Sequence, residues 1–125
     1  MKAVKHLLVI GMVVSLGLSL NACLADIFNP MPTASLKLAG GDPYGPVPCT
    51  ITFDISGSKA PYGEIVSFSL DFGDGTPPFT GTDLTQPIVH TYETPGTYIA
   101  RLTVTDDRGR SSVSPGLVIS PKEGG

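Results

Sequence analysis

Apolar and polar residues alternate along the stretch from Glu64 to Phe72, which is the most informative pattern in the chain. A period of two residues is typical of a β-strand with one buried face and one exposed face. The strand runs directly into Gly73-Asp74-Gly75, and its Asp-Gly pair favours a tight turn. The residues expected on the buried face are Val66, Phe68, Leu70 and Phe72.

The same period recurs on both sides of this central strand. It is most regular from Thr97 to Thr105, and it is also clear from Val47 to Asp54. Shorter candidate strands are 35–39, 87–92 and 111–120. Short strands at regular spacing predict an all-β protein, an immunoglobulin-like antiparallel β-sandwich of about seven strands. The inner residues expected from the two long strands are Val47, Cys49, Ile51, Phe53, Tyr98, Ala100, Leu102 and Val104.

Glycine and proline mark the connections between these strands, since the chain has 15 Gly and 12 Pro. Residues 76–83 contain Pro77, Pro78 and Gly81, so we expect an irregular connection there. The run 106–109 is expected to form a hairpin turn. The Pro115-Gly116 pair predicts a bulge or an edge position in the last strand.

The N-terminus has the three parts of a secretory signal, and we assign residues 1–25 to it. Lys2 and Lys5 form a charged start, and an uncharged apolar run follows from Leu7 to Leu20. The run is shorter than the ~20 residues that span a bilayer, although a short anchor helix reaching Leu24 is an alternative. Export is therefore expected, with 26–34 as a linker, 35–120 as the domain and 121–125 as a tail.

Two cleavage sites fit the end of this signal. Leu20-Asn21-Ala22-Cys23 resembles a bacterial lipobox, although Asn21 is uncommon at its place. Acylation of Cys23 would hold the protein at a membrane surface, as a cell-envelope lipoprotein. Cleavage after Ala25 would instead release a freely secreted protein. The second cysteine, Cys49, lies on an apolar strand face and is expected to be a buried thiol.

The charge of the chain argues against nucleic acid as a partner. The formal net charge is −3, and the part after the signal has six basic residues against eleven acidic ones. Nucleic-acid binding requires a basic stripe that displaces phosphate counterions. Here the basic residues are scattered among acids: Lys37, Lys59, Arg101, Arg108, Arg110 and Lys122.

No group of residues predicts catalysis. His90 is the only histidine outside the signal, and no Gly-x-Ser-x-Gly elbow accompanies it. Asp71 and Asp74 would need a cleft around a sugar ring to act as a glycosidase pair, and a domain of this size with short loops leaves little room for one. We therefore expect Asp71 on a polar strand face, Asp74 in a turn, and no catalytic residue.

Two kinds of binding site deserve consideration. Calcium prefers clustered oxygen ligands, for which Asp42, Asp106 and Asp107 are the candidates, with Asp26 or Asn29 from the linker. The alternative for the adjacent Asp106 and Asp107 is a solvated turn. Aromatic rings in loops can stack on sugars or cap a small core. The candidates for stacking are Tyr44, Tyr62 and Phe79.

Several spaced motifs resemble the PKD (polycystic kidney disease) domain. They are SFSLDFGDGT at 67–76, His-Thr-Tyr at 90–92, Pro-Gly-Thr-Tyr at 95–98, Leu-Thr-Val-Thr-Asp at 102–106, Gly109, and ITFDISGS at 51–58. The family usually has Trp before the Asp-Phe-Gly-Asp-Gly run, whereas this chain has Leu70 and no Trp. The core must then close around Phe68, Phe72 and Tyr98. The motif residues expected to be structural are Asp71, Phe72, Gly73, Asp74, Gly75, His90, Tyr92, Gly96 and Tyr98.

The resemblance implies a non-catalytic β-sandwich that serves at cell surfaces and in secreted enzymes as a spacer or as a binding module. Some members of the family bind calcium at one end of the sandwich. We therefore expect an exported domain that mediates protein–protein or cell-surface interaction, with an extracellular protein or polysaccharide as its partner. The alternative is a carbohydrate-binding accessory module of secreted polysaccharide-degrading systems.

Overall fold

The computed structural model describes residues 30–124, which form eight β-strands and no helix. The predicted signal 1–25 with Cys23, and the first residues of the predicted linker, lie outside the described residues. Within 30–124 there is accordingly no helix that could cross a membrane. The strands are β1 (Lys37–Gly40), β2 (Cys49–Asp54), β3 (Ile65–Asp71), β4 (Phe79–Gly81), β5 (Ile88–Tyr92), β6 (Tyr98–Asp106), β7 (Ser111–Val113) and β8 (Leu117–Ile119).

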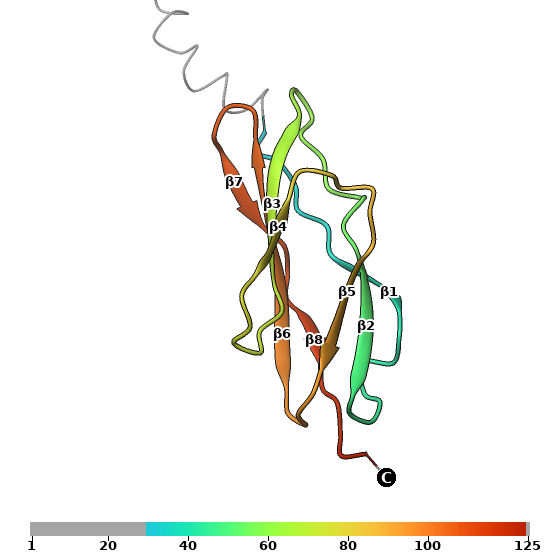
Figure 1. Cartoon of the computed structure of the whole chain (residues 1–125). Helices are drawn as coiled ribbons and strands as arrows, with labels where there is room; N and C mark the ends of the chain where they lie inside the picture. The colour runs from blue at the N-terminus through green and yellow to red at the C-terminus, as the bar shows by residue number, and fades with distance from the viewer. Residues whose placement is uncertain (1–29, 125) are drawn as a thin grey trace, which may run out of the picture. The chain divides into compact units, whose positions relative to one another are not determined.

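The strands form two antiparallel sheets that face each other, which confirms the predicted β-sandwich (Figure 1). One sheet has the order β1-β2-β5. The other has the order β4-β3-β6-β7, and β8 also pairs with β6. The β6–β7 turn lies at one end of the sandwich, whereas the β1–β2 connection and the last described residues lie at the other (Figure 1).

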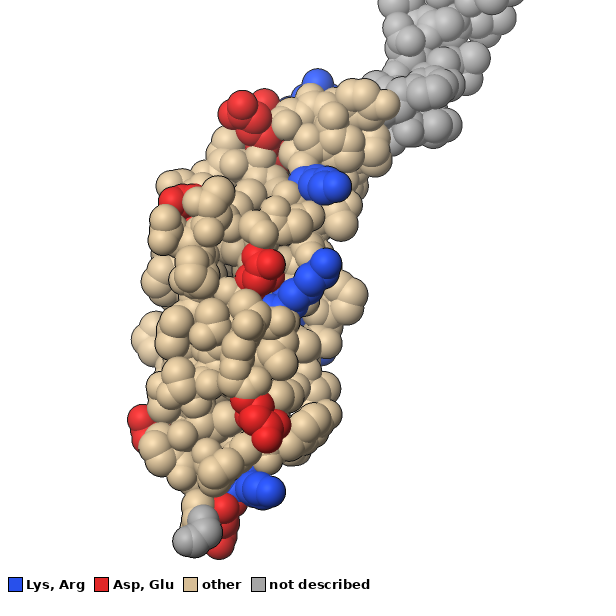
Figure 2. Space-filling model, turned by 90° about the vertical axis from the view of Figure 1, so that its right-hand side faces the viewer, with Lys and Arg blue, Asp and Glu red and all other residues tan. Residues whose placement is uncertain are grey.

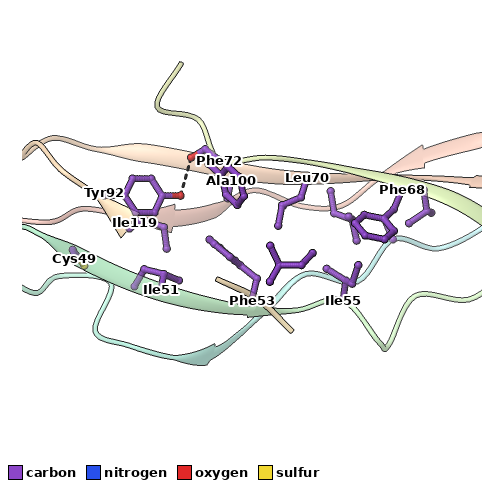
Figure 3. Close-up of a cluster of buried hydrophobic side chains, with 14 residues drawn as sticks. Cys49, Ile51, Phe53, Ile55, Phe68, Leu70, Phe72, Tyr92, Ala100 and Ile119 are labelled. Atoms are coloured by element: carbon purple, nitrogen blue, oxygen red, sulfur yellow. Dashed lines mark hydrogen bonds between the residues drawn. The ribbon is translucent and has the colours of Figure 1, made fainter. Parts of the chain in front are cut away.

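Inward-facing side chains of both sheets form the core (Figure 3). Phe53 of β2 and Leu70 of β3 are fully buried, and the Phe53 and Phe72 ring centroids lie 5.8 Å apart. Phe68 and Phe72 are buried as predicted, and Tyr98, partly buried, packs against the core and stacks on Tyr92. Leucine thus occupies the place where the resembled family usually has tryptophan, and phenylalanine rings fill the space on either side of it.

In two segments the observed strands differ from the predicted ones. Residues 79–81, expected in an irregular connection, form β4, which pairs with β3 so that Thr80 lies opposite Ser69. Three residues are too few for an alternation to be visible in the sequence. Pro115-Gly116 divides the predicted last strand into β7 and β8, and both halves pair with β6. The structure therefore has eight strands where the sequence predicts about seven.

Val66 does not lie on the inner face where the alternation places it, because it is 44% exposed. The register between β3 and β6 shifts between Ile65 and Ser67. Such a bulge adds one unpaired residue and changes the face to which the flanking side chains point. Ile65 packs against the core instead.

The packed domain extends beyond both predicted boundaries. Thr33, assigned to the linker, exchanges backbone hydrogen bonds with Lys59, and Ala34 is buried. At the other end, Lys122 of the predicted tail bonds to the backbone of Gly45 and Val47. The sandwich therefore includes at least residues 33–122.

Charged residues are sparse on the side of the domain formed by β1, β2 and β5. Figure 2 shows this face with single blue and red side chains scattered over a mostly uncharged surface. The described residues form no basic stripe on this face, in agreement with the charge pattern of the sequence.

Candidate functional site

The turn after β3 is shaped by two glycines that adopt left-handed backbone conformations. Gly73 has φ 79° and Gly75 has φ 83°, values that other residues rarely adopt. A Cβ on Gly73 would clash with the Ile99 carbonyl oxygen, so a larger residue does not fit against β6. Asp71 accepts the Gly73 N–H at 2.9 Å and closes the turn. The backbone conformation of the Gly-Asp-Gly turn therefore sets the position of the Asp74 side chain.

Asp74 forms a cluster with His90 of β5. Its Oδ2 lies 2.7 Å from His90 Nε2, and its Oδ1 accepts hydrogen bonds from the Thr76 N–H and hydroxyl. The His90 ring stacks on Phe72 at a centroid distance of 3.8 Å and an interplanar angle of 3°. Burial opposes ionisation of Asp74, but the bonds from Thr76 and His90 outweigh it, so the pKa of Asp74 lies below its ordinary value of 3.8.

Two tyrosines complete this cluster. The Tyr92 hydroxyl donates to the Phe72 carbonyl at 2.8 Å, and Figure 3 shows this bond crossing between the sheets. Burial raises the pKa of Tyr92 above its ordinary value. Tyr98 stacks on Tyr92 at 5.1 Å and donates to the Thr94 carbonyl. The two sheets are thus joined by Phe72, Asp74, His90 and the two tyrosines.

The cluster lacks the arrangement that nucleophilic catalysis requires. A general base needs a free ring nitrogen within hydrogen-bond reach of a nucleophile. His90 Nε2 is engaged by Asp74, and Phe72 covers one face of its ring. Within residues 30–124, no serine, threonine or cysteine side chain bonds to His90. The geometry supports a structural role for these motif residues.

The Asp74 contacts predict a defined response to acid. Because its pKa is lower in the folded protein than in the unfolded chain, the stability it contributes is present at neutral pH and is lost as the pH falls through and below 3.8. We expect Asp74→Asn to cost about 1 kcal/mol at pH 7, and this deficit relative to wild type should shrink between pH 5 and 2. Urea unfolding of wild type and variant across this pH range measures the deficit at pH 7 and its decrease in acid. A deficit that stays constant down to pH 2 would contradict the assignment.

The three candidate calcium ligands do not lie together. Asp42 is in the β1–β2 connection, where the neighbouring Pro43 carbonyl accepts the Ser120 N–H. Asp106 and Asp107 are at the far end of β6, a strand of nine residues that separates them from Asp42 by roughly 25 Å. Residues 30–124 contain no group of three or more His, Cys, Asp or Glu placed to hold a metal ion.

Asp106 has a different role, because its carboxylate is buried in the β6–β7 turn. It accepts the backbone N–H groups of Arg108 and Arg110 at 3.0 and 2.9 Å, and it pairs with the Arg110 guanidinium at 2.9 Å. Desolvation opposes its ionisation, but the Arg110 and Arg108 amides and the guanidinium outweigh it, so the pKa of Asp106 is lowered. The carboxylate stabilises the hairpin turn from within.

The three candidate stacking rings are exposed but widely separated. Tyr44 is in the β1–β2 connection and Tyr62 in the β2–β3 connection, at opposite ends of the sandwich (Figure 1). Phe79 is on the edge strand β4, 48% exposed, with Phe68 stacked on it at 6.0 Å. These rings do not form one platform. Phe79 lies beside a groove.

That groove, of about 180 Å³, opens between β4 and β5. Apolar residues and the polar side chains of Asp83 and Gln86 line it together. The sequence indicated this site only through Phe79, because the groove arises from the pairing of β4 with β3. Its apolar lining is Phe68, Phe79, Pro87 and Ile88.

A second and larger groove, of about 420 Å³, lies on the outer face of the β4-β3-β6 sheet. No residue of its lining was a candidate in the sequence. The sequence could have indicated this groove only through the polar residues of each alternating strand, which place small hydroxyl side chains on the outer face. The groove is lined by Ser67, Phe68, Ser69, Thr80, Gly81, Thr82, Thr103 and Thr105.

Comparison with known proteins agrees with this architecture. A sequence model of the PKD domain family matches residues 29–118. Collagenase ColQ1 of Bacillus cereus (strain Q1) is 39% identical over 97 residues, which are 77% of this chain and 9% of the collagenase. The chain therefore spans less than a tenth of the length of this relative.

Two solved structures show the same fold. The PKD1 domain from the Vibrio cholerae metalloprotease PrtV is 28% identical, with a TM-score of 0.56, and the match covers 74% of this chain and 98% of that domain. A structure that explains the promiscuous specificity of carbohydrate-binding modules from the β-sandwich superfamily is 34% identical, with a TM-score of 0.61. That match covers 76% of this chain and 36% of the other.

Proposed function

Because the chain belongs to the PKD domain family, we propose that it is a non-catalytic module that binds an extracellular macromolecule, a protein or a cell-surface polymer. The observation that carries this proposal is that the ionisable motif residues are engaged in contacts within the fold. Asp74 and His90 bond to each other, and the flanking aromatic rings join the two sheets. Asp74 and His90 are thus engaged in holding the fold, which favours the outer surface as the functional part of the domain.

The location that fits this function is outside the cytoplasm. The signal predicted in residues 1–25 supports export, and acylation of Cys23 would place the domain at the cell envelope as a small lipoprotein. Mass spectrometry of the mature protein tests this directly. A diacylglycerol-modified Cys23 as the first residue is expected for the lipoprotein, whereas a chain that starts at Asp26 would show free secretion.

A second candidate function is an accessory module that binds carbohydrate for secreted polysaccharide-degrading systems. The hydroxyl-lined groove on the β4-β3-β6 sheet favours it, as does the 34% identity to a structure concerned with carbohydrate-binding modules. The two functions differ in the chemistry of the partner, and they share the same non-catalytic sandwich.

Co-sedimentation tests the proposal. We expect the purified protein to sediment with isolated cell envelopes of the producing organism or with insoluble collagen, while an unrelated β-sandwich of similar size and charge stays in the supernatant. Protease treatment of the envelopes removes a protein partner, and periodate oxidation removes a polysaccharide partner. A protein that sediments with neither material would contradict a binding function.

A further inference from the structure

The larger groove gathers hydroxyl groups, most of which have no hydrogen-bond partner among residues 30–124. Most described side-chain hydroxyls outside it are bonded, such as the Thr50 and Thr91 pair at 2.9 Å and Thr85 on Asp83 at 2.6 Å. Thr105 at the groove margin is bonded to Ser111 at 2.7 Å. Five groove hydroxyls have no hydrogen-bond partner in the part of the chain that the structure describes: Ser67, Ser69, Thr80, Thr82 and Thr103.

The strand register arranges these hydroxyls as a two-dimensional array. β3 and β6 each contribute two outward residues separated by one inward residue, while β4 contributes Thr80, and Thr82 follows directly after β4. Ser69 lies opposite Thr80 on one side and opposite Thr103 on the other. Neighbouring strands are about 4.8 Å apart, and outward residues on one strand are about 6.8 Å apart. The hydroxyls therefore present donors and acceptors at regular intervals along and across the groove.

The lining of the groove has no charged side chain. An anionic ligand would need Lys or Arg, and a cationic ligand would need Asp or Glu. An apolar peptide would cover the half-buried hydroxyls of Ser69 and Thr103 without offering them partners, which is unfavourable. A hydroxyl donates one hydrogen bond and accepts others, so it is matched best by a ligand that also carries many neutral hydroxyls.

We infer that this groove is the binding site for a neutral polysaccharide. The inference rests on the proposed binding function and assigns it a partner class and a surface. Phe68, Gly81 and Thr82 line both this groove and the smaller one beside it, so the exposed Phe79 ring lies next to the array. Phe68 stacks on that ring, and the surface of Phe79 that remains exposed can contact a sugar unit that extends past β4.

Native gels that contain a soluble polysaccharide provide the test, since binding retards the protein. The neutral probes are hydroxyethylcellulose, xylan and dextran, and the anionic probes are polygalacturonate and heparin. We expect retardation of the full chain by at least one neutral probe and by neither anionic probe. The double variant Ser69→Ala with Thr103→Val should weaken that retardation about tenfold, because two hydroxyl contacts are lost.

Thr52→Val is the matched control, since Thr52 lies on β2 in the other sheet and its hydroxyl also has no described partner. It should bind as wild type does, and thermal melting should show that the double variant is folded. Two results would overturn the inference: no neutral probe retards the protein, or the double variant binds as tightly as wild type. If the protein nevertheless sediments with protease-sensitive envelope material, the proposed function stands and only the assignment to this groove fails.

Discussion

Replacing Asp106 with alanine is expected to lower the melting temperature of the domain by about 10 °C or more. The carboxylate is 2% exposed and accepts the amides of Arg108 and Arg110 as well as the Arg110 guanidinium. Its removal takes the acceptor from the Arg108 and Arg110 amides and from the Arg110 guanidinium at once, which costs more than the loss of one ordinary hydrogen bond. Thermal melting followed by circular dichroism measures the effect.

Two further variants make this prediction specific. Asp106→Asn keeps an oxygen for the two amides and loses the charge opposite Arg110, so its melting temperature should fall between those of wild type and Asp106→Ala. Asp107→Ala is the matched control, because Asp107 is the adjacent acid and is exposed in the same turn. It should change the melting temperature by only a few degrees. Equal losses from Asp106→Ala and Asp107→Ala would show that the buried carboxylate does not hold the turn.

The fold was predictable because its long strands alternate strictly. In β6, every second residue from Ala100 to Val104 is fully buried, as the period requires. In β3, the same rule succeeds at Phe68 and Leu70 and fails at Val66, where a bulge shifts the register. A bulge depends on the partner strand, so the local pattern of β3 contains no sign of it.

The candidate sites were less predictable, because each depends on contacts between segments far apart in the sequence. From the sequence alone, Asp42 and Asp106 are equally plausible oxygen ligands. Only the topology shows that the length of β6 separates them. The hydroxyl groove requires β4 to pair with β3 and β3 with β6. Its serines and threonines were visible as the polar half of each strand, but their common surface follows from the register alone.

The replacement of the family's tryptophan by Leu70 leads to the second large effect. Leu70 is fully buried between the two sheets, so we expect Leu70→Ala to reduce the free energy of unfolding by about 3 kcal/mol. This cost combines the lost transfer energy of the side chain with a cavity that the surrounding Phe68, Phe72 and Phe53 rings cannot fill. Urea unfolding at neutral pH measures it, with Val113→Ala, at a 58% exposed position, as a control within about 0.5 kcal/mol.

Leu70→Trp distinguishes a core that has adapted to leucine from one that merely lacks the larger ring. Phe72 already packs between Phe53 and His90, with ring centroids at 5.8 and 3.8 Å. An indole at position 70 must displace these rings, so we expect the variant to be less stable than wild type by about 1–3 kcal/mol. If Leu70→Trp instead raises the urea midpoint, space for the indole remains beside Leu70, and the phenylalanines do not compensate for the missing tryptophan.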